Sequence, residues 1–337
     1  MRLLWQNYRY HSQVGFNLAF KNHKYPRMND PLNQPVSTPP VAPTLGQSLW
    51  TAVQYALPHH AISRVVFRLS RWQTPFTAAV IRWFVRRYGV DLSEAVEPDP
   101  AAYASFNAFF TRALNPDLRP MPACARAWVS PCDGRLSQLG AIQSGNLLQA
   151  KGRDYTVTQL LGGDVALAQQ FEHGQFATIY LSPKDYHRIH MPCAGTLREM
   201  IHVPGRLFSV SPVTVQQVPE IFARNERLVC VFDTEHGPLA MVLVGAINVA
   251  AIETVWAGLV TPPAGRAVSR RHYGAESGMV ISLKRGQEMG RFNMGSTVVM
   301  LLPAGFEFDA TWQAQSPIQL GNTLGAPAQS DEFMQRN

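Results

Sequence analysis

The 337-residue sequence has few cysteines, no long apolar run and no nucleotide-binding fingerprint. Its four cysteines form no Cys-x-x-Cys pair, which argues against a disulfide framework or a cysteine-based zinc site and fits a reducing compartment. The longest apolar run, Leu239–Ile252, has about 14 residues, whereas a spanning helix needs about 20. Residues 1–27 lack the apolar core of a signal peptide. We therefore expect a cytoplasmic protein without a transmembrane helix, and we interpret Leu239–Ile252 as buried strand.

Acidic residues are scarce at the front of the chain. The formal net charge is +7, of which residues 1–58 carry +4, while residues 59–90 carry +6 because they hold six arginines and no acidic residue. The remaining 247 residues therefore carry −3. A mildly acidic body with a basic front disfavours nucleic-acid binding, which usually needs a basic face on the folded domain. It favours an anionic membrane surface instead.

Composition divides the chain into three predicted parts. Residues 1–45 form a flexible leader, because Asn29–Pro43 has five prolines and almost no large apolar residue; Met1 and Met28 are both candidate start positions. Residues 46–125 form a helical, membrane-associating region, and residues 126–337 form a β-rich domain. The expected fold class is α+β, with a helical N-terminal membrane-facing part followed by a largely antiparallel β body.

Residues 47–89 are predicted to be helical. In His60–Trp72, apolar residues recur at spacings of three and four. Thr74 and Pro75 have the pattern of an N-cap and a first helical position, and Gly89 is a natural stop. The side chains expected to face inward from this second helix are Phe76, Val80, Trp83, Phe84 and Tyr88.

Two interpretations of this helix pair remain open. In one, the pair packs on the domain with solvated arginines. In the other, it lies in a membrane interface with its apolar face in the acyl boundary and its arginines at anionic headgroups. Both hold if the pair docks on the protein and on lipid by different edges. The candidate membrane-binding residues are Arg64, Arg68, Arg71, Trp72, Arg82, Trp83 and Arg86.

Further along the chain, a short helix is expected at Tyr103–Leu114, and β-rich runs begin at Trp128. Thr234–Pro238 has the composition of a hairpin turn. The expected strands are Phe176–Leu181, Leu197–Val203, Leu228–Asp233, Leu239–Asn248, Met279–Leu283 and Thr297–Leu302.

Three segments hold candidate chemistry. Asp133 lies in an Asp-Gly turn, which in isolation is most simply a plain turn. His187 and His190 are three residues apart after a predicted strand, and they are surface histidines, metal ligands or catalytic histidines. A metal site lacks a third ligand nearby in the sequence. Gly295-Ser296-Thr297 opens a β-prone run in which Gly295 can adopt backbone angles closed to other residues, although such a triplet alone is usually a turn.

Taken together and in this order, the segments resemble the phosphatidylserine decarboxylase family, pyruvoyl-dependent enzymes that make phosphatidylethanolamine. The resemblance covers roughly residues 47–325. Met294 stands where the family usually has leucine, a residue of similar volume and polarity. The matching stretches are Cys132–Gly134, Tyr180–Pro192, Phe222–Arg227, Ile252–Gly258 and Lys284–Thr297.

The resemblance implies that the chain is a proenzyme that cleaves itself between Gly295 and Ser296. A charge-relay set of Asp133, His190 and Ser296 would activate the serine hydroxyl, which needs an adjacent base. Attack on the Gly295 carbonyl gives an ester, and β-elimination then releases a β chain (1–295). Hydrolysis of the resulting dehydroalanine releases ammonia and leaves a pyruvoyl group on the α chain (296–337).

That pyruvoyl group is the implied cofactor, with no metal and no external cofactor. In the family its ketone forms a Schiff base with the substrate amine, and the adjacent carbonyl serves as the electron sink. His187 is implied to reprotonate the α-carbon or to position the substrate carboxylate. The implied partners are phosphatidylserine, the anionic membrane surface and the α and β chains as a heterodimer, either alone or as a dimer of heterodimers. The implied location is peripheral, at the cytoplasmic face of the cell membrane.

Two other functions remain as alternatives. The first is a serine hydrolase that uses Ser296, His190 and Asp133 on external substrates, although no Gly-x-Ser-x-Gly elbow is present. The second is a non-catalytic peripheral membrane protein. Both predict a chain that stays intact.

Overall fold

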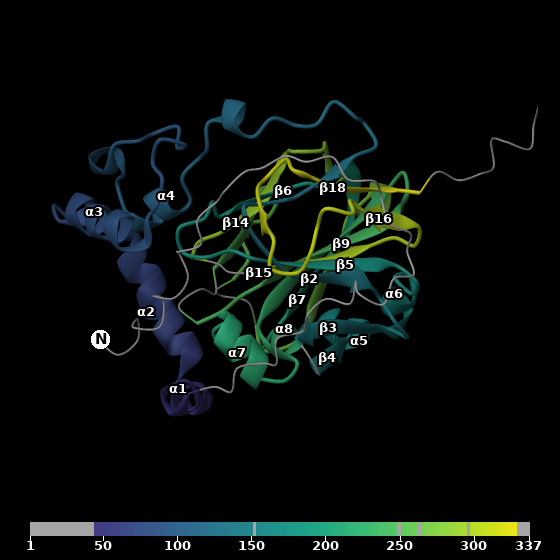
Figure 1. Cartoon of the computed structure of the whole chain (residues 1–337), viewed down its shortest axis with the longest axis horizontal. Helices are drawn as coiled ribbons and strands as arrows, with labels where there is room; N and C mark the ends of the chain where they lie inside the picture. Colours follow the sequence, from purple (N-terminus) through teal and green to yellow (C-terminus); the bar gives the residue numbers. More distant parts are fainter. Residues whose placement is uncertain (1–43, 151–152, 248–250, 262–264, 295–296, 329–337) are drawn as a thin grey trace, which may run out of the picture. The chain divides into compact units, whose positions relative to one another are not determined.

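Helices come first along the chain and strands follow (Figure 1). The computed structural model describes residues 44–150, 153–247, 251–261, 265–294 and 297–328. The predicted leader up to residue 43 and the Gly295–Ser296 bond lie outside the described residues. The described residues all belong to one compact unit. The α+β class with a largely antiparallel β body is confirmed.

The first three helices are the longest, and they begin and end at recognisable signals. Thr44 caps α1 reciprocally with Gln47, and Gly89 ends α3 in the left-handed region at φ 68°. The predicted N-cap at Thr74 was wrong, because Thr77 closes a turn onto the Thr74 carbonyl at 3.0 Å and α3 begins only there. The helices are α1 Leu45–Ala56, α2 His59–Arg71, α3 Thr77–Tyr88, η4 Pro100–Ala102, α4 Phe106–Phe110, η5 Pro116–Leu118, α5 Val157–Leu160, α6 Val165–Gln169, α7 Pro212–Gln217, α8 Ile221–Arg224 and η6 Ala275–Ser277.

A nine-stranded antiparallel sheet forms the centre of the body, in the order β12-β7-β8-β9-β15-β5-β2-β17, with β13 beside β7. The predicted hairpin turn is confirmed, since Thr234 and Gly237 are paired at the end of β8 and β9. The strands of this sheet are β2 Gly134–Ala141, β5 Gln175–Tyr180, β7 Gly195–Val203, β8 Arg227–Thr234, β9 Gly237–Val244, β12 Ser269–His272, β13 Ser282–Leu283, β15 Thr297–Leu302 and β17 Pro317–Ile318.

Three smaller sheets accompany the large one. The four-stranded sheet, in the order β11-β10-β14-β6, carries His190 on β6, and His187 directly precedes that strand. The three-stranded sheet has the order β1-β18-β16, and β3 and β4 form a hairpin. Their strands are β6 Arg188–His190, β10 Ile252–Thr254, β11 Gly258–Leu259, β14 Glu288–Phe292, β1 Trp128–Val129, β16 Phe306–Phe308, β18 Thr323–Pro327, β3 Asn146–Ala150 and β4 Arg153–Thr156.

Both faces of the large sheet are buried. Side chains alternate along a strand, so in β8 Cys230 and Phe232 enter one apolar core while Val229 and Val231 enter the other. The first core also contains side chains from the four-stranded and three-stranded sheets. The second contains side chains from α5–α8 and from the β3–β4 hairpin. A strand buried on both faces reads as a continuous apolar run, which explains the sequence of β9.

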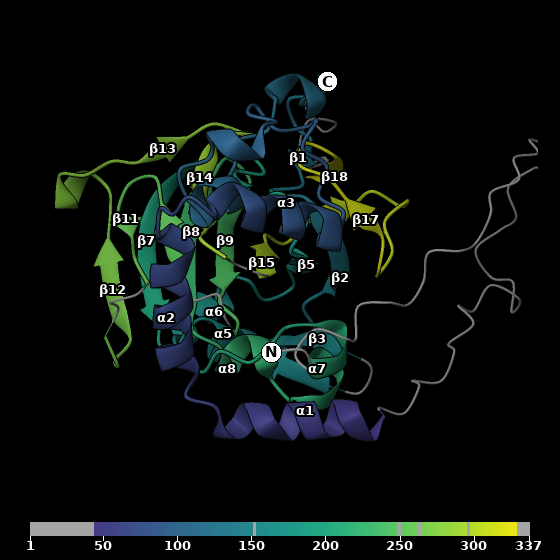
Figure 2. The ribbon, with the colours of Figure 1, turned by 90° about the vertical axis from the view of Figure 1, so that its left-hand side faces the viewer.

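The N-terminal helices pack on the body through polar contacts and a small separate core. Figure 2 shows α2 running between α1, which lies beside α7, and α3. Ser209 donates its amide proton to the Gln54 side-chain oxygen of α1 at 2.7 Å. The separate core joins α3 and α4 through Ile81, Phe84 and Phe109, and Met294 packs against it. The helices therefore contact the chain immediately before residue 295.

The apolar residues of α2 and α3 largely face away from the protein. Phe76, Val80 and Trp83, which were predicted to face inward, are exposed, so that prediction was wrong. Phe84 is buried as expected, and Ile81 shares its face. The exposed large apolar side chains of the three helices are Leu45, Leu49, Val53, Tyr55, Val65, Leu69, Trp72, Phe76, Val80 and Trp83.

Candidate active site

In the sequence, the Gly295–Ser296 bond falls between β14 and β15, and β14 pairs with β6, the strand that carries His190. Glu288 lies opposite His190 in this pairing, and the Phe292 amide donates to the His187 carbonyl at 3.0 Å. The described chain runs up to Met294 and resumes at Thr297.

Upstream of the bond, Asn293 is held from three directions. Its side-chain amide donates to Glu253 at 3.0 Å, its side-chain oxygen accepts from Asn107 at 2.9 Å, and its backbone amide donates to the Ala251 carbonyl at 2.8 Å. Met294 then adopts φ 76°, in the left-handed region that few residues other than glycine occupy. The chain therefore turns sharply just before the bond.

Downstream of the bond, Thr297 begins β15 between two strands. It is paired with Tyr180 of β5 and with Val244 of β9, and its side chain is buried. The Thr297 hydroxyl has no hydrogen-bond partner among the described residues. A polar group is thus buried beside residue 296 without a compensating bond, which is unusual in a folded protein.

His187 is fully buried at the end of the Ser182–Asp185 turn. Its Nδ1 lies 2.8 Å from the Asp185 carbonyl oxygen, and its ring centre lies 4.1 Å from that of Phe110. A carbonyl only accepts hydrogen bonds, so Nδ1 carries the proton and Nε2 is the basic nitrogen of the neutral ring.

His190 is held through both ring nitrogens. Nδ1 donates to the Gly286 carbonyl at 2.8 Å, which leaves Nε2 to accept from the Tyr186 hydroxyl at 2.9 Å. Burial lowers the pKa of His190, while the negative charge of Asp133 acts in the opposite direction and raises it. The ring is therefore neutral near pH 7, with its basic nitrogen engaged by a phenol.

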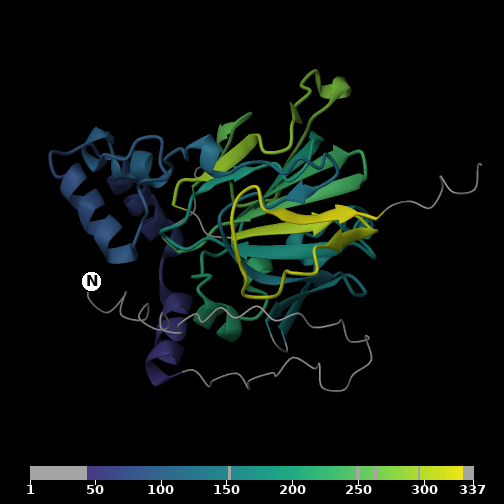
Figure 3. The same ribbon diagram turned by 45° about the horizontal axis from the view of Figure 1, so that its top comes forward.

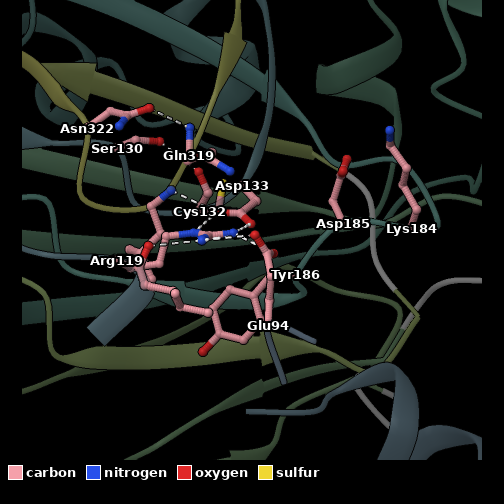
Figure 4. A network of polar contacts seen from close by, with 12 residues as sticks. Glu94, Arg119, Ser130, Cys132, Asp133, Lys184, Asp185, Tyr186, Gln319 and Asn322 are labelled. Carbon is pink, nitrogen blue, oxygen red and sulfur yellow. Dashed lines mark hydrogen bonds and ion pairs between the residues drawn. The ribbon is translucent and has the colours of Figure 1, made fainter. Parts of the chain in front are cut away.

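Asp133 forms a buried ion pair with Arg119 (Figure 4). Arg119 donates to both carboxylate oxygens at 3.2 and 2.7 Å, and the Leu320 amide donates to one of them at 2.8 Å. Arg119 also pairs with Glu94 at 2.8 Å. The hydrogen bonds to Asp133 raise the pKa of Arg119, so this cation stays charged.

The structure brings Asp133 and His190 into one neighbourhood without the direct contact of a charge-relay set. The His190 amide donates to the Pro131 carbonyl at 2.8 Å, so the two backbones lie side by side. Yet the polar side-chain atoms of both residues bind other groups of the described chain. The groups that bind these side chains, Arg119 for Asp133 and Tyr186 for His190, were not predicted from the sequence. Tyr186 lies inside the Tyr180–Pro192 motif, whereas no sequence pattern links Arg119 to Asp133.

The candidate membrane residues lie on the exposed side of the helices. Arg64, Arg68, Arg82 and Arg86 are exposed, as are Trp72 and Trp83, whereas Arg71 is half-buried and its guanidinium lies 3.7 Å from the centre of the Phe67 ring. An apolar groove of about 490 Å³ opens between α2 and α3. Its lining includes Leu69, Trp72, Phe76, Val80 and Phe106.

The described residues contain neither a membrane-spanning helix nor a cluster of metal ligands. None of the helices in this part of the chain is both long and apolar enough to cross a membrane. No group of three or more histidine, cysteine, aspartate or glutamate side chains within the described ranges is arranged to hold a metal ion.

Comparison with known proteins identifies the family. A family model described as phosphatidylserine decarboxylase matches residues 106–326, and a second, described as PSD, matches residues 49–89. The phosphatidylserine decarboxylase proenzyme of Alkalilimnicola ehrlichii is 59% identical over 254 residues, which are 75% of this chain and 88% of that protein. Those of Delftia acidovorans and Bordetella pertussis are each 56% identical, over 80% and 83% of this chain and 95% of each protein.

These matches define an enzyme of the decarboxylase class. The chain belongs to the phosphatidylserine decarboxylase family, as the resemblance of its motifs predicted.

Proposed function

We propose that this protein converts phosphatidylserine into phosphatidylethanolamine with a pyruvoyl group made from its own Ser296. The observation that carries the proposal is the family match over residues 106–326, which includes both histidines, Asp133 and the Gly295–Ser296 bond. The three-part division into residues 1–45, 46–125 and 126–337 belongs to the same proposal, as does cleavage into a β chain and an α chain that stay together as a heterodimer.

Self-cleavage is favoured by the way the chain is held on both sides of the bond. The side-chain bonds of Asn293 and the pairing of Thr297 with two strands anchor the described chain just before and just after the bond. The left-handed backbone at Met294 costs about 1–2 kcal/mol for a residue with a Cβ atom. A peptide bond held in one orientation reaches the geometry of attack more often than a freely moving one.

His190 is the proposed base of this step. Its neutral ring provides a lone pair on Nε2, and Tyr186 is the group that now donates to it. The proton of Ser296 therefore reaches Nε2 either through the Tyr186 hydroxyl or after Tyr186 has moved aside. Asp133 assists from within the Arg119 ion pair, because its charge favours the protonated ring.

The surroundings of residue 296 fit a pyruvoyl group. When present, that group supplies a ketone for the substrate amine and an electron sink for the loss of CO₂. The buried Thr297 hydroxyl is available to donate to one of its carbonyl oxygens. His187, buried against Phe110, is the proposed acid that returns a proton to the α-carbon or the group that positions the carboxylate, in a setting from which bulk water is largely excluded.

Membrane attachment through α1–α3 accompanies the proposed reaction, because the lipid substrate stays in the bilayer. Exposed apolar side chains flanked by arginines are the pattern of an interfacial helix. The small core of α3 and α4 contacts Met294 and, through Phe110, His187. A surface that binds lipid is therefore packed directly against the proposed catalytic residues. The proposed location is peripheral, at the cytoplasmic face of the cell membrane.

One experiment tests the proposal on the full-length protein. Intact mass and a denaturing gel should show two fragments that divide at Gly295–Ser296, with the smaller one blocked at its N-terminus, and the protein should convert phosphatidylserine in mixed vesicles. Ser296→Ala is the matched control and should remain one chain without activity. A wild-type protein that turns over phosphatidylserine as a single uncut chain would exclude the pyruvoyl route.

A further inference from the structure

Arg112 is a buried cation with most of its hydrogen-bonding capacity unused. It follows α4 directly and is 4% exposed. One terminal nitrogen, Nη2, donates to the Lys184 carbonyl at 3.0 Å. Nε and Nη1 are buried and have no hydrogen-bond partner among the residues that the structure describes. Within the described chain, no carboxylate forms an ion pair with Arg112 either.

A second buried arginine shows that this fold can satisfy such a group. Arg227, 2% exposed, donates to the carbonyls of Leu160, Gln159, Ala223 and Asn225 and so engages all three of its nitrogens. Burial lowers the pKa of both arginines. A buried cation with unsatisfied donors destabilises the folded state, so the arrangement at Arg112 requires an explanation that Arg227 does not.

Arg112 lies beside the proposed catalytic histidine. Phe110, two residues earlier, packs on the His187 ring, and the Lys184 carbonyl that Arg112 binds is three residues before His187. The nearby carboxylates are already engaged, since Asp133 binds Arg119 and Asp185 accepts from the Ser182 amide and hydroxyl at 2.6 and 2.8 Å. The unused donors therefore lie close in the chain to groups that contact His187, and no carboxylate of the described residues binds them directly.

We propose that Arg112 binds the phosphodiester group of the lipid substrate. This inference rests on the proposed function, which commits the substrate amine to residue 296 and leaves two anionic groups, the carboxylate and the phosphodiester. An ion pair with the carboxylate would stabilise the group that must lose its charge as CO₂ leaves, and so would raise the barrier. The phosphodiester keeps its charge throughout, and a planar guanidinium matches two of its oxygens.

A contact made equally with substrate and transition state changes KM and leaves kcat nearly unchanged. We expect Arg112→Met to raise KM for soluble short-chain phosphatidylserine at least about tenfold, with kcat within about threefold of wild type. Phosphatidylethanolamine has the phosphodiester and lacks the carboxylate, so its inhibition constant should rise by the same factor. Self-cleavage should be complete by intact mass.

Thermal unfolding separates this role from a structural one. Because the unsatisfied charge is removed, Arg112→Met should melt no lower than wild type. Arg153→Met is the matched control, since Arg153 is on β4 and binds only the Gln216 carbonyl through Nε at 2.9 Å, and it should leave KM unchanged. Arg112→Lys keeps the charge and should recover part of the affinity.

If the wild-type protein turns over phosphatidylserine, the proposed function stands, and three outcomes would still overturn the inference about Arg112. The first is an unchanged KM in Arg112→Met, and the second is a raised KM with unchanged affinity for phosphatidylethanolamine, which would place the contact at the carboxylate. The third is a lower melting temperature or failed processing in both Arg112→Met and Arg112→Lys, which would make Arg112 structural. Absence of turnover in the wild type would instead count against the proposed function.

Discussion

The β body and the three N-terminal helices differ in where their large apolar side chains lie. In the body, apolar residues fill two cores on either side of the large sheet. In α1–α3 the most deeply buried residues are mainly small or polar, and many of the large apolar ones are exposed. An exposed apolar patch of this extent marks a surface that binds something. The buried residues of these helices are Thr51, Gln54, His59, Ser63, Ser70, Thr77, Ile81 and Phe84.

Two of the polar residues buried in these helices bond to their own helix backbone. Thr51 donates to the Gln47 carbonyl at 3.1 Å and Ser70 to the Phe67 carbonyl at 3.0 Å, both within one turn. Small side chains also let α2 approach the protein closely. The comparison teaches that sequence periodicity shows which residues share a face, but not whether that face meets protein or lipid.

The largest effect should come from the histidines of the body. His190→Ala should block self-cleavage, and His187→Ala should cleave normally but lose activity by about 10²–10⁴-fold, the usual range for a general acid or base. Neither should alter vesicle binding, because both side chains lie away from the exposed helix face. Fragment analysis, turnover and vesicle co-sedimentation measure these separately. If His187→Ala stops processing instead, the assigned roles are reversed.

The next effect concerns the basic side of the helices. Replacing Arg64, Arg68, Arg71, Arg82 and Arg86 with glutamine should weaken binding to anionic vesicles at least a hundredfold at low salt, since each basic residue near such a surface contributes about 1 kcal/mol. Self-cleavage should be spared. A control that removes Arg153, Arg266 and Arg271 from the body should bind nearly as well as wild type. Unchanged binding of the helix variant in vesicle flotation would refute the membrane interpretation.

A matched pair of aromatic substitutions tests the comparison directly. Phe232 is fully buried in β8, so Phe232→Ala should cost about 3–5 kcal/mol of unfolding free energy. Trp83 is 59% exposed, so Trp83→Ala should change stability by no more than about 0.5 kcal/mol and yet weaken vesicle binding. Urea unfolding and vesicle flotation give the two readouts. Strong destabilisation by Trp83→Ala would mean that the exposed face serves the fold.

The smallest effect depends on pH. His59 is buried at the start of α2, where burial, followed by the nearby Arg206 and His60 side chains, lowers its pKa from 6.5 to about 4. The folded state therefore resists protonation. Its stability is full above about pH 6.5 and falls as the pH drops toward 4, by about 2 kcal/mol between pH 7 and pH 5. His59→Gln should flatten this part of the stability profile in urea unfolding; an equally steep variant would exclude His59 as the cause.

Much of the fold was predictable because the strands are short and clearly bounded. The prediction for Thr297–Leu302 matches β15, and the β8–β9 hairpin was found from its turn. The expected helix at Tyr103–Leu114 is only Phe106–Phe110, since Ser105 caps it late and the chain leaves the helix at Thr111. The strands β6 and β14 are too short for an alternation of apolar and polar residues to be recognised in the sequence, although they position the histidines.

The site was predictable only where its residues lie in contiguous motifs. His187 and His190 were found because they share one segment. Arg112 and Arg119 were missed, because their contacts with Lys184 and Asp133 depend on how a loop crosses the body. Such pairings follow from topology, and hydrophobic periodicity carries no information about them.

The position of β15 in the large sheet has a consequence for the cleaved protein. β15 is paired on one side with β5 and on the other with β9, so the C-terminal strands lie among strands of the preceding chain (Figure 3). After cleavage, the 42-residue fragment 296–337 would hold the middle of a sheet whose neighbours belong to the other fragment. Their interface is then the hydrophobic core itself, the pattern of an obligate complex. The two fragments should separate only on unfolding, and refolding from denaturant should depend on protein concentration, although the gene encodes one chain.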